Sequence, residues 1–377
     1  MHYLDWIAIG GYFILLLGLG FYKSSKKGND SDFILAGRKL SLPGFIATLV
    51  ATWYGGILGV GENTYHYGIQ TWFIFAFPYY VFGLLFAIFL APKIRNLPHH
   101  SIPDHFRKHF GHNAGIFSAV LILFLASPAP YILSFGILLQ HTLGWNLLPA
   151  ILFSTIVSLI YIWYGGFRSV IRTDILQFIF MFTGFVFLLV FSWNYFGPPK
   201  KLFTELPEHY FDPTGGNSIQ YILVWFFIAL WTFIDPGFYQ RTAAAKSPET
   251  AQKGILISIG FWFVFDFLTI STGLYAVAIL PNQTAAMAYP ELAAHILPPF
   301  VYGIFLIGLF STIMSTIDSN GLISAITFGR DILLRVQQKD EHGKDETRYI
   351  RKGLVVMAII AVLLALSIPS VVQLWYV

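Results

Sequence analysis

The sequence contains no cysteine and few charged residues. Without cysteine, the chain can form neither disulfides nor thiolate metal sites. Only 11% of its 377 residues are Asp, Glu, Lys or Arg, whereas a soluble domain averages roughly 25%. So few charges cannot cover the water-facing surface of a chain of this length. The N-terminus also lacks a basic region and a small-residue cleavage site, so we expect its first apolar run to be a retained helix.

Long apolar runs take the place of the missing charges, since 56% of the residues are hydrophobic and 18% aromatic. A helix needs about 20 residues to cross a hydrocarbon core of ~30 Å. Ten runs reach that length approximately: Tyr3–Tyr22, Leu42–Glu62, Gln70–Ala91, Gly115–Leu139, Leu147–Tyr164, Val170–Trp193, Ser218–Gln240, Gly254–Leu280, Pro299–Phe328 and Leu354–Ser367. They do not alternate as barrel strands would. The predicted fold class is an all-α integral membrane protein with about ten transmembrane helices in a single domain over 1–377.

Basic residues lie in alternate connections between these runs. Of the 23 lysines and arginines, all but Lys200 and Lys201 lie in every second connection. The positive-inside rule makes those connections cytoplasmic. We therefore expect a multi-pass protein of the cell membrane with its N-terminus outside.

Two runs carry residues that interrupt a helix. The second contains four glycines shortly after Tyr54, and the seventh contains Asp235, Pro236 and Gly237. Proline removes a helix donor and clashes with the preceding turn, and broken helices mark the binding site in many transporters. The two runs lie five apart, as the first helices of two inverted five-helix repeats would. The alternative is that these residues serve close packing or kinks.

Polar residues inside the apolar runs are further candidates. Asp174 is either a functional acid or the partner of Arg168 or Arg172, and Asp266 is either a buried hydrogen-bonding group or a coupling group. The ninth run carries a polar face flanked by Asp318, and its hydroxyls are Thr312, Ser315, Thr316 and Ser319. Hydroxyl and carbonyl oxygens suit a small hard cation, although hydroxyls also bond helices together.

The segment 99–112 holds five of the eleven histidines, and His105 and His109 have the i, i+4 spacing of zinc ligands. Neither a cysteine nor a convergent pair of carboxylates accompanies them. The segment is interpreted as a solvated amphipathic stretch, and no transition metal is predicted.

Five segments in order resemble the sodium/solute symporter family: Phe33–Ser41, Ile102–Gly111, Gly165–Gln177, Asp235–Ser247 and Met314–Ser319. The resemblance implies the leucine-transporter-like inverted-repeat fold with broken first and sixth core helices. One extra N-terminal helix (1–22) would precede the repeats 42–193 and 218–377. Because this sequence stops at Val377 and a tenth core helix would begin at Leu374, the second repeat is expected to be incomplete.

The resemblance also implies a function, namely sodium-coupled symport of a small polar organic solute into the cell by alternating access. The sodium site would use the carbonyls of Ala51, Tyr54 and Thr312 and the hydroxyls of Ser315 and Thr316, and Asp174 would serve a second cation or coupling. The substrate would lie near Trp53, Tyr54, Trp231, Phe233 and Asp235. Sodium would be the coupling ion, and no cofactor, enzyme activity or nucleic-acid partner is expected. Proton coupling through Asp174 or Asp266, and the transporter-like module of a sensor protein, remain alternatives.

Overall fold

The computed structural model describes residues 1–22, 30–337, 346–368, 370–371 and 374, and these are almost entirely helical. The described ranges contain no strand beyond an isolated bridge between Leu40 and Ala245. Trp375–Val377, where a further helix was expected to begin, and five of the basic residues lie outside the described residues. Those five are Lys23, Lys26, Lys27, Lys339 and Lys344.

Within the part of the chain that the structure describes, ten spans are long and apolar enough to cross a membrane when one bent pair of helices counts as a single span, as the sequence predicts. They are Tyr3–Phe21, Leu42–Trp53 with Ile57–Tyr67, Gln70–Phe89, His112–Leu143, Leu147–Gly165, Phe167–Phe196, Ile219–Ala244, Pro248–Ile279, Val301–Leu334 and Glu346–Ser367. The prediction of an all-α membrane protein is thereby confirmed. The division of the chain into two inverted repeats stays a prediction.

The spans are built from α1 (Tyr3–Phe21), α3 (Leu42–Trp53), α4 (Ile57–Tyr67), α5 (Gln70–Phe75), α6 (Phe77–Phe89), α9 (His112–Leu125), α10 (Ala129–Leu143), α11 (Leu147–Gly165), α12 (Phe167–Phe196), α14 (Ile219–Ile228), η3 (Ala229–Phe233), α15 (Pro236–Ala244), α16 (Pro248–Ile279), α18 (Val301–Ile326), the π-helical η5 (Thr327–Leu334) and α19 (Glu346–Ser367). Shorter helices connect them: α2 (Asp30–Leu35), η1 (Ala36–Arg38), α7 (Ala91–Asn96), α8 (Ile102–Phe110), α13 (Pro199–Glu205), η2 (Glu208–Phe211), η4 (Ala285–Met287) and α17 (Ala288–Ile296).

Local sequence explains where several of these helices begin. Ser101 caps α8 by accepting a hydrogen bond from the amide of Asp104, and Ser247 caps α16 through the amide of Thr250. Both caps satisfy amides that have no partner within the helix. Proline follows early in each of these helices, where its missing N–H removes nothing.

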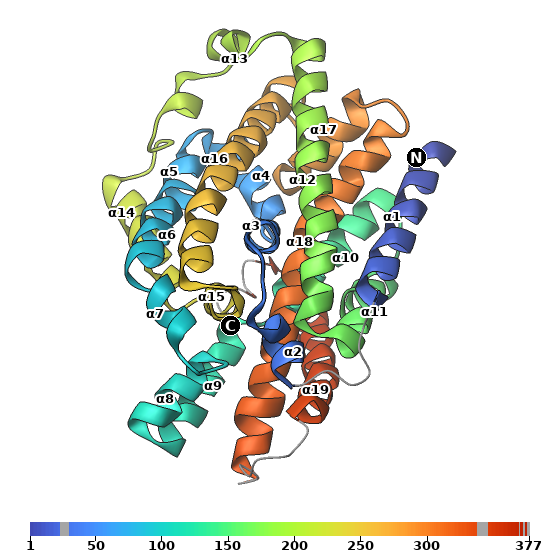
Figure 1. Ribbon diagram of the computed structural model, residues 1–377. Helices are drawn as coiled ribbons and strands as arrows, with labels where there is room; N and C mark the ends of the chain where they lie inside the picture. The colour runs from blue at the N-terminus through green and yellow to red at the C-terminus, as the bar shows by residue number, and fades with distance from the viewer. Residues whose placement is uncertain (23–29, 338–345, 369, 372–373, 375–377) are drawn as a thin grey trace.

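Helix α18 forms the centre of the bundle and packs along α12, with α1, α3, α10 and α11 around it. Of the residues in its most apolar stretch, 83% are buried inside the protein, against 28% for α1 at the periphery. Short elements lie at the two ends of the bundle (Figure 1): α2 and α8 at one, α13 and α17 at the other. The arrangement places basic-rich α8 at the end opposite α13, which carries Lys200 and Lys201.

Both interruptions expected from the sequence lie inside the bundle. Helices α3 and α4 meet at 57° across Tyr54, Gly55 and Gly56. In the seventh span, α14 passes into the tighter helix η3, and α15 then restarts after Asp235. The break between α3 and α4 faces α18, because a Cβ on Gly55 would lie 2.6 Å from the Thr316 side chain. Only glycine allows the backbone to come this close.

Candidate cation and solute site

Backbone and hydroxyl oxygens meet where the end of α3 faces α18. The Ser315 hydroxyl donates to the carbonyl of Ala51 at 2.7 Å and lies 3.2 Å from that of Thr312. The Thr316 hydroxyl lies 2.7 Å from the carbonyl of Thr52 and 3.3 Å from that of Thr312. All five residues lie in one interface, and Ala51, Thr312 and Ser315 are completely buried. The structure therefore brings together four of the five residues predicted for the sodium site.

Tyr54, the fifth predicted member, is placed differently. Its carbonyl accepts a hydrogen bond from the amide of Ile57 at 3.0 Å, within the break itself. The carbonyl nearest to Thr316 is that of Thr52, which the sequence did not single out. Its position directly beside Ala51, ahead of the glycines, was the available signal. The sequence alone could not show which carbonyl near the break faces Thr316, because that depends on the direction of the helix axis.

This set of oxygens has the chemistry of a site for a small hard cation. Carbonyl and hydroxyl oxygens are hard ligands. A hydroxyl carries one donor and two lone pairs, so it can bond a carbonyl in one orientation and offer a lone pair to a cation in another. These oxygens belong to carbonyls and hydroxyls and carry no formal charge, which favours an ion with a modest cost of dehydration.

Asp174 lies on α12, the helix that packs against both α3 and α18, and it faces a buried arginine. Its carboxylate is 3.7 Å from the guanidinium of Arg241 and accepts a hydrogen bond from Thr48. Arg241 also donates to Thr48 at 3.0 Å, to Thr52 at 2.7 Å and to Ser319 at 2.6 Å. The network connects α3, α12, α15 and α18 through one side chain.

The salt bridge considered for Asp174 with Arg168 or Arg172 is therefore wrong. Arg168 pairs with Asp32 at 2.7 Å, and Arg172 donates to the carbonyl of Tyr22 at the end of α1. Both arginines are thus bonded to other groups, at the end of α1 and on α2, although Arg172 lies only two residues before Asp174 along α12. Arg241 was missed because its position after the break in the seventh run could not be related to Asp174 without the fold.

Asp266 is held by two tyrosines. Its carboxylate accepts hydrogen bonds from the hydroxyl of Tyr54 at 3.0 Å and from that of Tyr80. The Tyr54 hydroxyl also lies 3.2 Å from the carbonyl of Trp262. The hydrogen-bonding role expected as one of two alternatives is thus present, and it joins α16 to the break after α3. Asp318 is similarly bonded, by the hydroxyl of Tyr161.

Aromatic rings lie beside both breaks. Trp53 packs against Trp262, Tyr79 and Phe238, with ring centroids 5.0, 5.1 and 5.5 Å away. In η3, Trp231 and Phe233 are half-buried. The sequence predicted Trp53, Trp231 and Phe233 near the solute.

Asp235, also predicted near the solute, has a structural role as a helix cap in this conformation. Its carboxylate accepts a hydrogen bond of 2.6 Å from the amide of Phe238 and so caps α15. The aspartate therefore begins the second half of the broken span.

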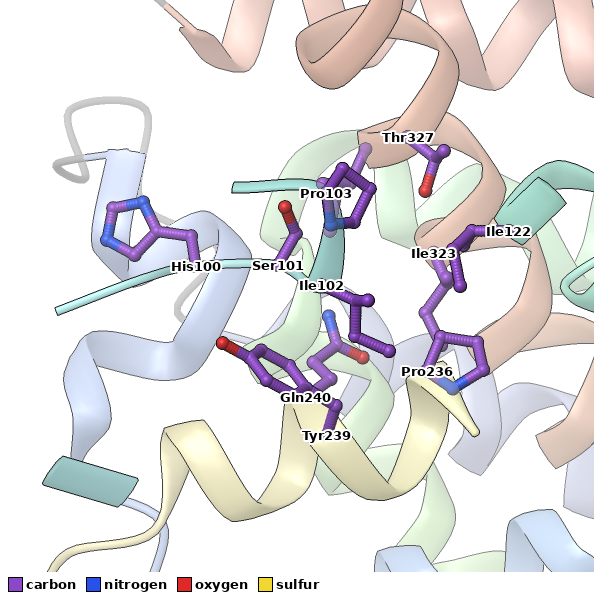
Figure 2. Close-up of a pocket in the computed structure, with 11 residues that line it drawn as sticks. His100, Ser101, Ile102, Pro103, Ile122, Pro236, Tyr239, Gln240, Ile323 and Thr327 are labelled. Atoms are coloured by element: carbon purple, nitrogen blue, oxygen red, sulfur yellow. The ribbon is translucent and has the colours of Figure 1, made fainter. Parts of the chain in front are cut away.

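A pocket lies between α15 and the start of α8, below α15 in the orientation of Figure 1. Figure 2 shows it in close-up from another direction, with α15 along the bottom of the view. Pro236, Tyr239 and Gln240 of α15 form one wall, and residues at the start of α8 face them. Its remaining lining comes from α9, α18 and η5: Ile122, Ile323, Ile326 and Thr327. The broken seventh span thus borders this pocket with its second half.

An ion-pair cluster fixes α8 at the edge of this pocket. Asp104 lies 2.8 Å from Arg330 of η5 and 3.7 Å from Arg335. Burial raises the pKa of the Asp104 carboxyl, but the two arginines outweigh it and hold the pKa below its ordinary value. Arg330 also bonds Glu346 at 2.8 Å, so that α8, η5 and α19 are joined.

Comparison with known proteins agrees with this architecture. The model of the sodium:solute symporter family matches residues 33–377. The chain is 25% identical to the high-affinity choline transporter 1 of Drosophila melanogaster over 392 residues, which cover 98% of this chain and 63% of that protein. It is 25% identical to the osmoregulated proline transporter OpuE of Bacillus subtilis, with 97% and 78% covered. It is 28% identical to the sodium/pantothenate symporter of Haemophilus influenzae, with 67% and 54% covered. The chain thus spans less than two thirds of the length of the first and third of these relatives.

A solved structure shares the fold. The substrate-bound, outward-open state of a Na⁺-coupled sialic acid symporter superposes with a TM-score of 0.85 at 17% identity, covering 97% of this chain and 82% of that one. A manganese transporter of Eremococcus coleocola is more distant, with a TM-score of 0.52 at 12% identity over 91% of this chain and 73% of that one. At these identities the likeness is one of fold.

Proposed function

The chain belongs to the sodium:solute symporter family, and on that premise we propose that it carries a small polar organic solute into the cell by sodium-coupled secondary active symport. The observation that supports this most directly is the group of oxygens from Ala51, Thr312, Ser315 and Thr316 at the break after α3. A cation bound there would join α3 to α18 across the break. Its binding would therefore favour one arrangement of the two helices over another, as coupling requires.

The first test measures the thermal midpoint of the purified protein in NaCl and in N-methylglucamine chloride at equal ionic strength. Choline is avoided as the inert cation because one relative is a choline transporter. A ligand at about 100 times its dissociation constant stabilises the folded state by about 2.7 kcal/mol. We expect a sodium-specific rise in the midpoint of the wild-type protein.

Thr316→Val tests the site itself, because it removes the hydroxyl and keeps the branched shape. A bond to a charged group is worth about 1.5–3 kcal/mol, so the sodium concentration that produces a given rise in the midpoint should increase about tenfold or more. Ser324→Ala is the control, since that buried hydroxyl of α18 bonds the carbonyl of Gly321 within its own helix. An unchanged sodium response in Thr316→Val would rule out this site.

The solute is proposed to lie between the two breaks, against the aromatic rings of Trp53, Trp231 and Phe233. The solutes named for the relatives are choline, proline and pantothenate, all small and polar. Tyr54 and Asp235 are proposed to shape this region indirectly, because their side chains bond Asp266 and the start of α15. Uptake of radiolabelled candidates into proteoliposomes, with and without an inward sodium gradient, tests both the coupling and the solute.

For Asp174 we propose a coupling role exerted through Arg241, which reaches Thr52 beside the cation site. The alternative of proton coupling through Asp174 or Asp266 predicts uptake driven by a pH gradient in the absence of sodium. The sodium-coupled mechanism predicts that such a gradient drives none. The proposed location is the cell membrane, with the N-terminus outside.

A further inference from the structure

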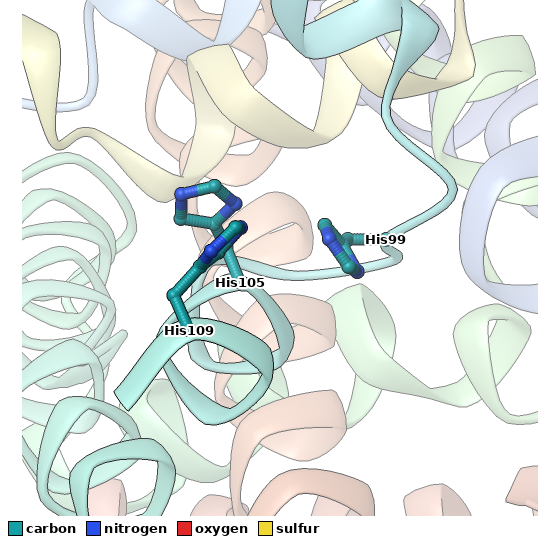
Figure 3. Close-up of side chains that lie close together, drawn as sticks. All are labelled: His99, His105 and His109. Carbon is teal, nitrogen blue, oxygen red and sulfur yellow. The ribbon is translucent and has the colours of Figure 1, made fainter. Parts of the chain in front are cut away.

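Three histidines gather at the end of the bundle that carries α8, away from the cation site. They are His99, which precedes α8, and His105 and His109, which lie one turn apart on that helix. One ligand nitrogen from each lies within 4.8 Å of the other two. Figure 3 shows the three rings around one small space, two rising from the helix and one approaching from the connection.

The third histidine, His99, is brought to the other two by the fold of the backbone. The sequence alone does not predict this. Spacing indicates only His105 and His109, since His99 lies outside the helix. The connection folds back on α8 because Ser101 caps the helix and the amide of His100 bonds the carboxylate of Asp104 at 3.2 Å. Arg38 fixes the same connection by donating to the carbonyls of Leu97 and His99. The ring of His99 then lies 5.5 Å from that of His105, and the ring of His109 lies 4.5 Å from that of His105.

One of the three histidines also has a ring nitrogen suited to coordination. The Nδ1 atom of His105 is buried and has no hydrogen-bond partner among the described residues. An unpartnered buried polar atom is unusual in a folded protein, and a ligand is one way to satisfy it.

From this geometry we propose that His99, His105 and His109 form a binding site for a divalent transition metal of the zinc class. This replaces the interpretation of the segment as merely solvated, which was based on two histidines. Zinc–nitrogen distances of about 2.0–2.1 Å in a tetrahedral site place the ligand atoms roughly 3.4 Å apart. Small rotations of the exposed His109 and the half-buried His99 and His105 bring the nitrogens to that spacing. Water takes the fourth position, as in other three-histidine sites.

The metal would fasten the connection to α8. The residues that follow His99, from His100 to Pro103, line the pocket below α15. A metal ion bound to His99 and to the helix would hold this wall of the pocket in place. The site and its occupant do not depend on the proposed transport function.

The test is a titration of the purified, untagged full chain with ZnCl₂ by calorimetry, followed by Co²⁺ as a spectroscopic probe. We expect one ion per chain at the site and the visible absorption of tetrahedral Co²⁺. Loss of an outer-shell partner already weakens metal sites about 10–100-fold. His109→Gln and His99→Gln should each weaken binding by at least that factor and abolish the tetrahedral Co²⁺ spectrum.

His112→Gln is the matched control, since this exposed histidine at the start of α9 is not one of the three. It should bind as the wild type does. Thermal midpoints measured in EDTA verify that each variant is folded. Binding that is unaffected by His99→Gln, or a wild-type chain that takes up no ion at this segment, would overturn the proposal.

Discussion

At the residue scale, the ion pair between Arg241 and Asp174 lies wholly out of water, with side chains 1% and 0% exposed. Removing both charges from water is expensive, and breaking such a pair by deleting one partner costs about 3–5 kcal/mol. The Arg241 guanidinium also bonds three hydroxyl groups. The arginine should therefore matter more to stability than any surface charge of this protein.

We predict that Arg241→Gln lowers the thermal midpoint by about 6–10 °C, taking roughly 2 °C for each of the 3–5 kcal/mol in a chain of this size. It leaves Asp174 charged and without a counter-charge. The double variant Arg241→Gln with Asp174→Asn should regain part of that loss, because neither buried charge remains. Lys253→Gln is the control, since its partner Glu249 is 70% exposed and the pair is screened by water. A double variant less stable than the sum of its single changes would contradict the pairing.

Individual residues differ in how far the sequence predicts them. Ser315, Thr316 and Asp174 could be singled out as candidates because hydroxyls at helical spacing and an acid in an apolar run are local patterns. Arg241 and Thr52 were not, because their roles depend on how α15 and α3 meet α18. His99 was missed for the same reason. Its partners are joined to it by a fold of the connection before α8 and not by any periodicity.

At the scale of elements, the start of α15 depends on Asp235. Its carboxylate caps the helix through the amide of Phe238, and replacing such a cap by alanine costs about 0.5–2 kcal/mol. Asparagine caps as well as aspartate does. The two substitutions therefore distinguish a helix cap from a charge that recognises solute.

We predict that Asp235→Asn keeps the thermal midpoint within about 1 °C of the wild type, whereas Asp235→Ala lowers it by about 1–4 °C. If the carboxylate acts only as a cap, sodium-driven uptake in proteoliposomes should follow the same order. Uptake that is lost in Asp235→Asn while the midpoint is retained would show that the charge itself acts on the solute. The capping role and the role in binding are thus separated by one neutral substitution.

The elements themselves were largely predictable. Continuous apolar runs and the glycines and proline inside two of them indicate ten spans and two breaks, and the structure has both breaks where they were expected. The 57° bend between α3 and α4 could not be derived. It depends on how closely Gly55 approaches Thr316, a contact between residues far apart in the sequence.

At the scale of the whole molecule, the sidedness of the bundle depends on where its basic residues lie. The structure places α8 and α13 at opposite ends, and the positive-inside rule assigns the end rich in lysine and arginine to the cytoplasm. Lys93 of α7 and Lys200 of α13 are both exposed lysines, one in a basic-rich and one in a basic-poor connection. They are a matched pair for testing orientation.

Because the chain contains no cysteine, a single introduced cysteine is the only thiol that can be labelled. We predict that Lys200→Cys reacts with a membrane-impermeant maleimide on intact cells, whereas Lys93→Cys reacts only after the membrane is permeabilised. The cysteine-free parent chain gives the background signal. Equal labelling of the denatured variants shows that both are expressed. The reverse pattern would place the N-terminus inside the cell. The opposite end of the bundle, with the pocket below α15 and the three histidines, would then face the exterior. The metal could in that case be supplied from outside the cell.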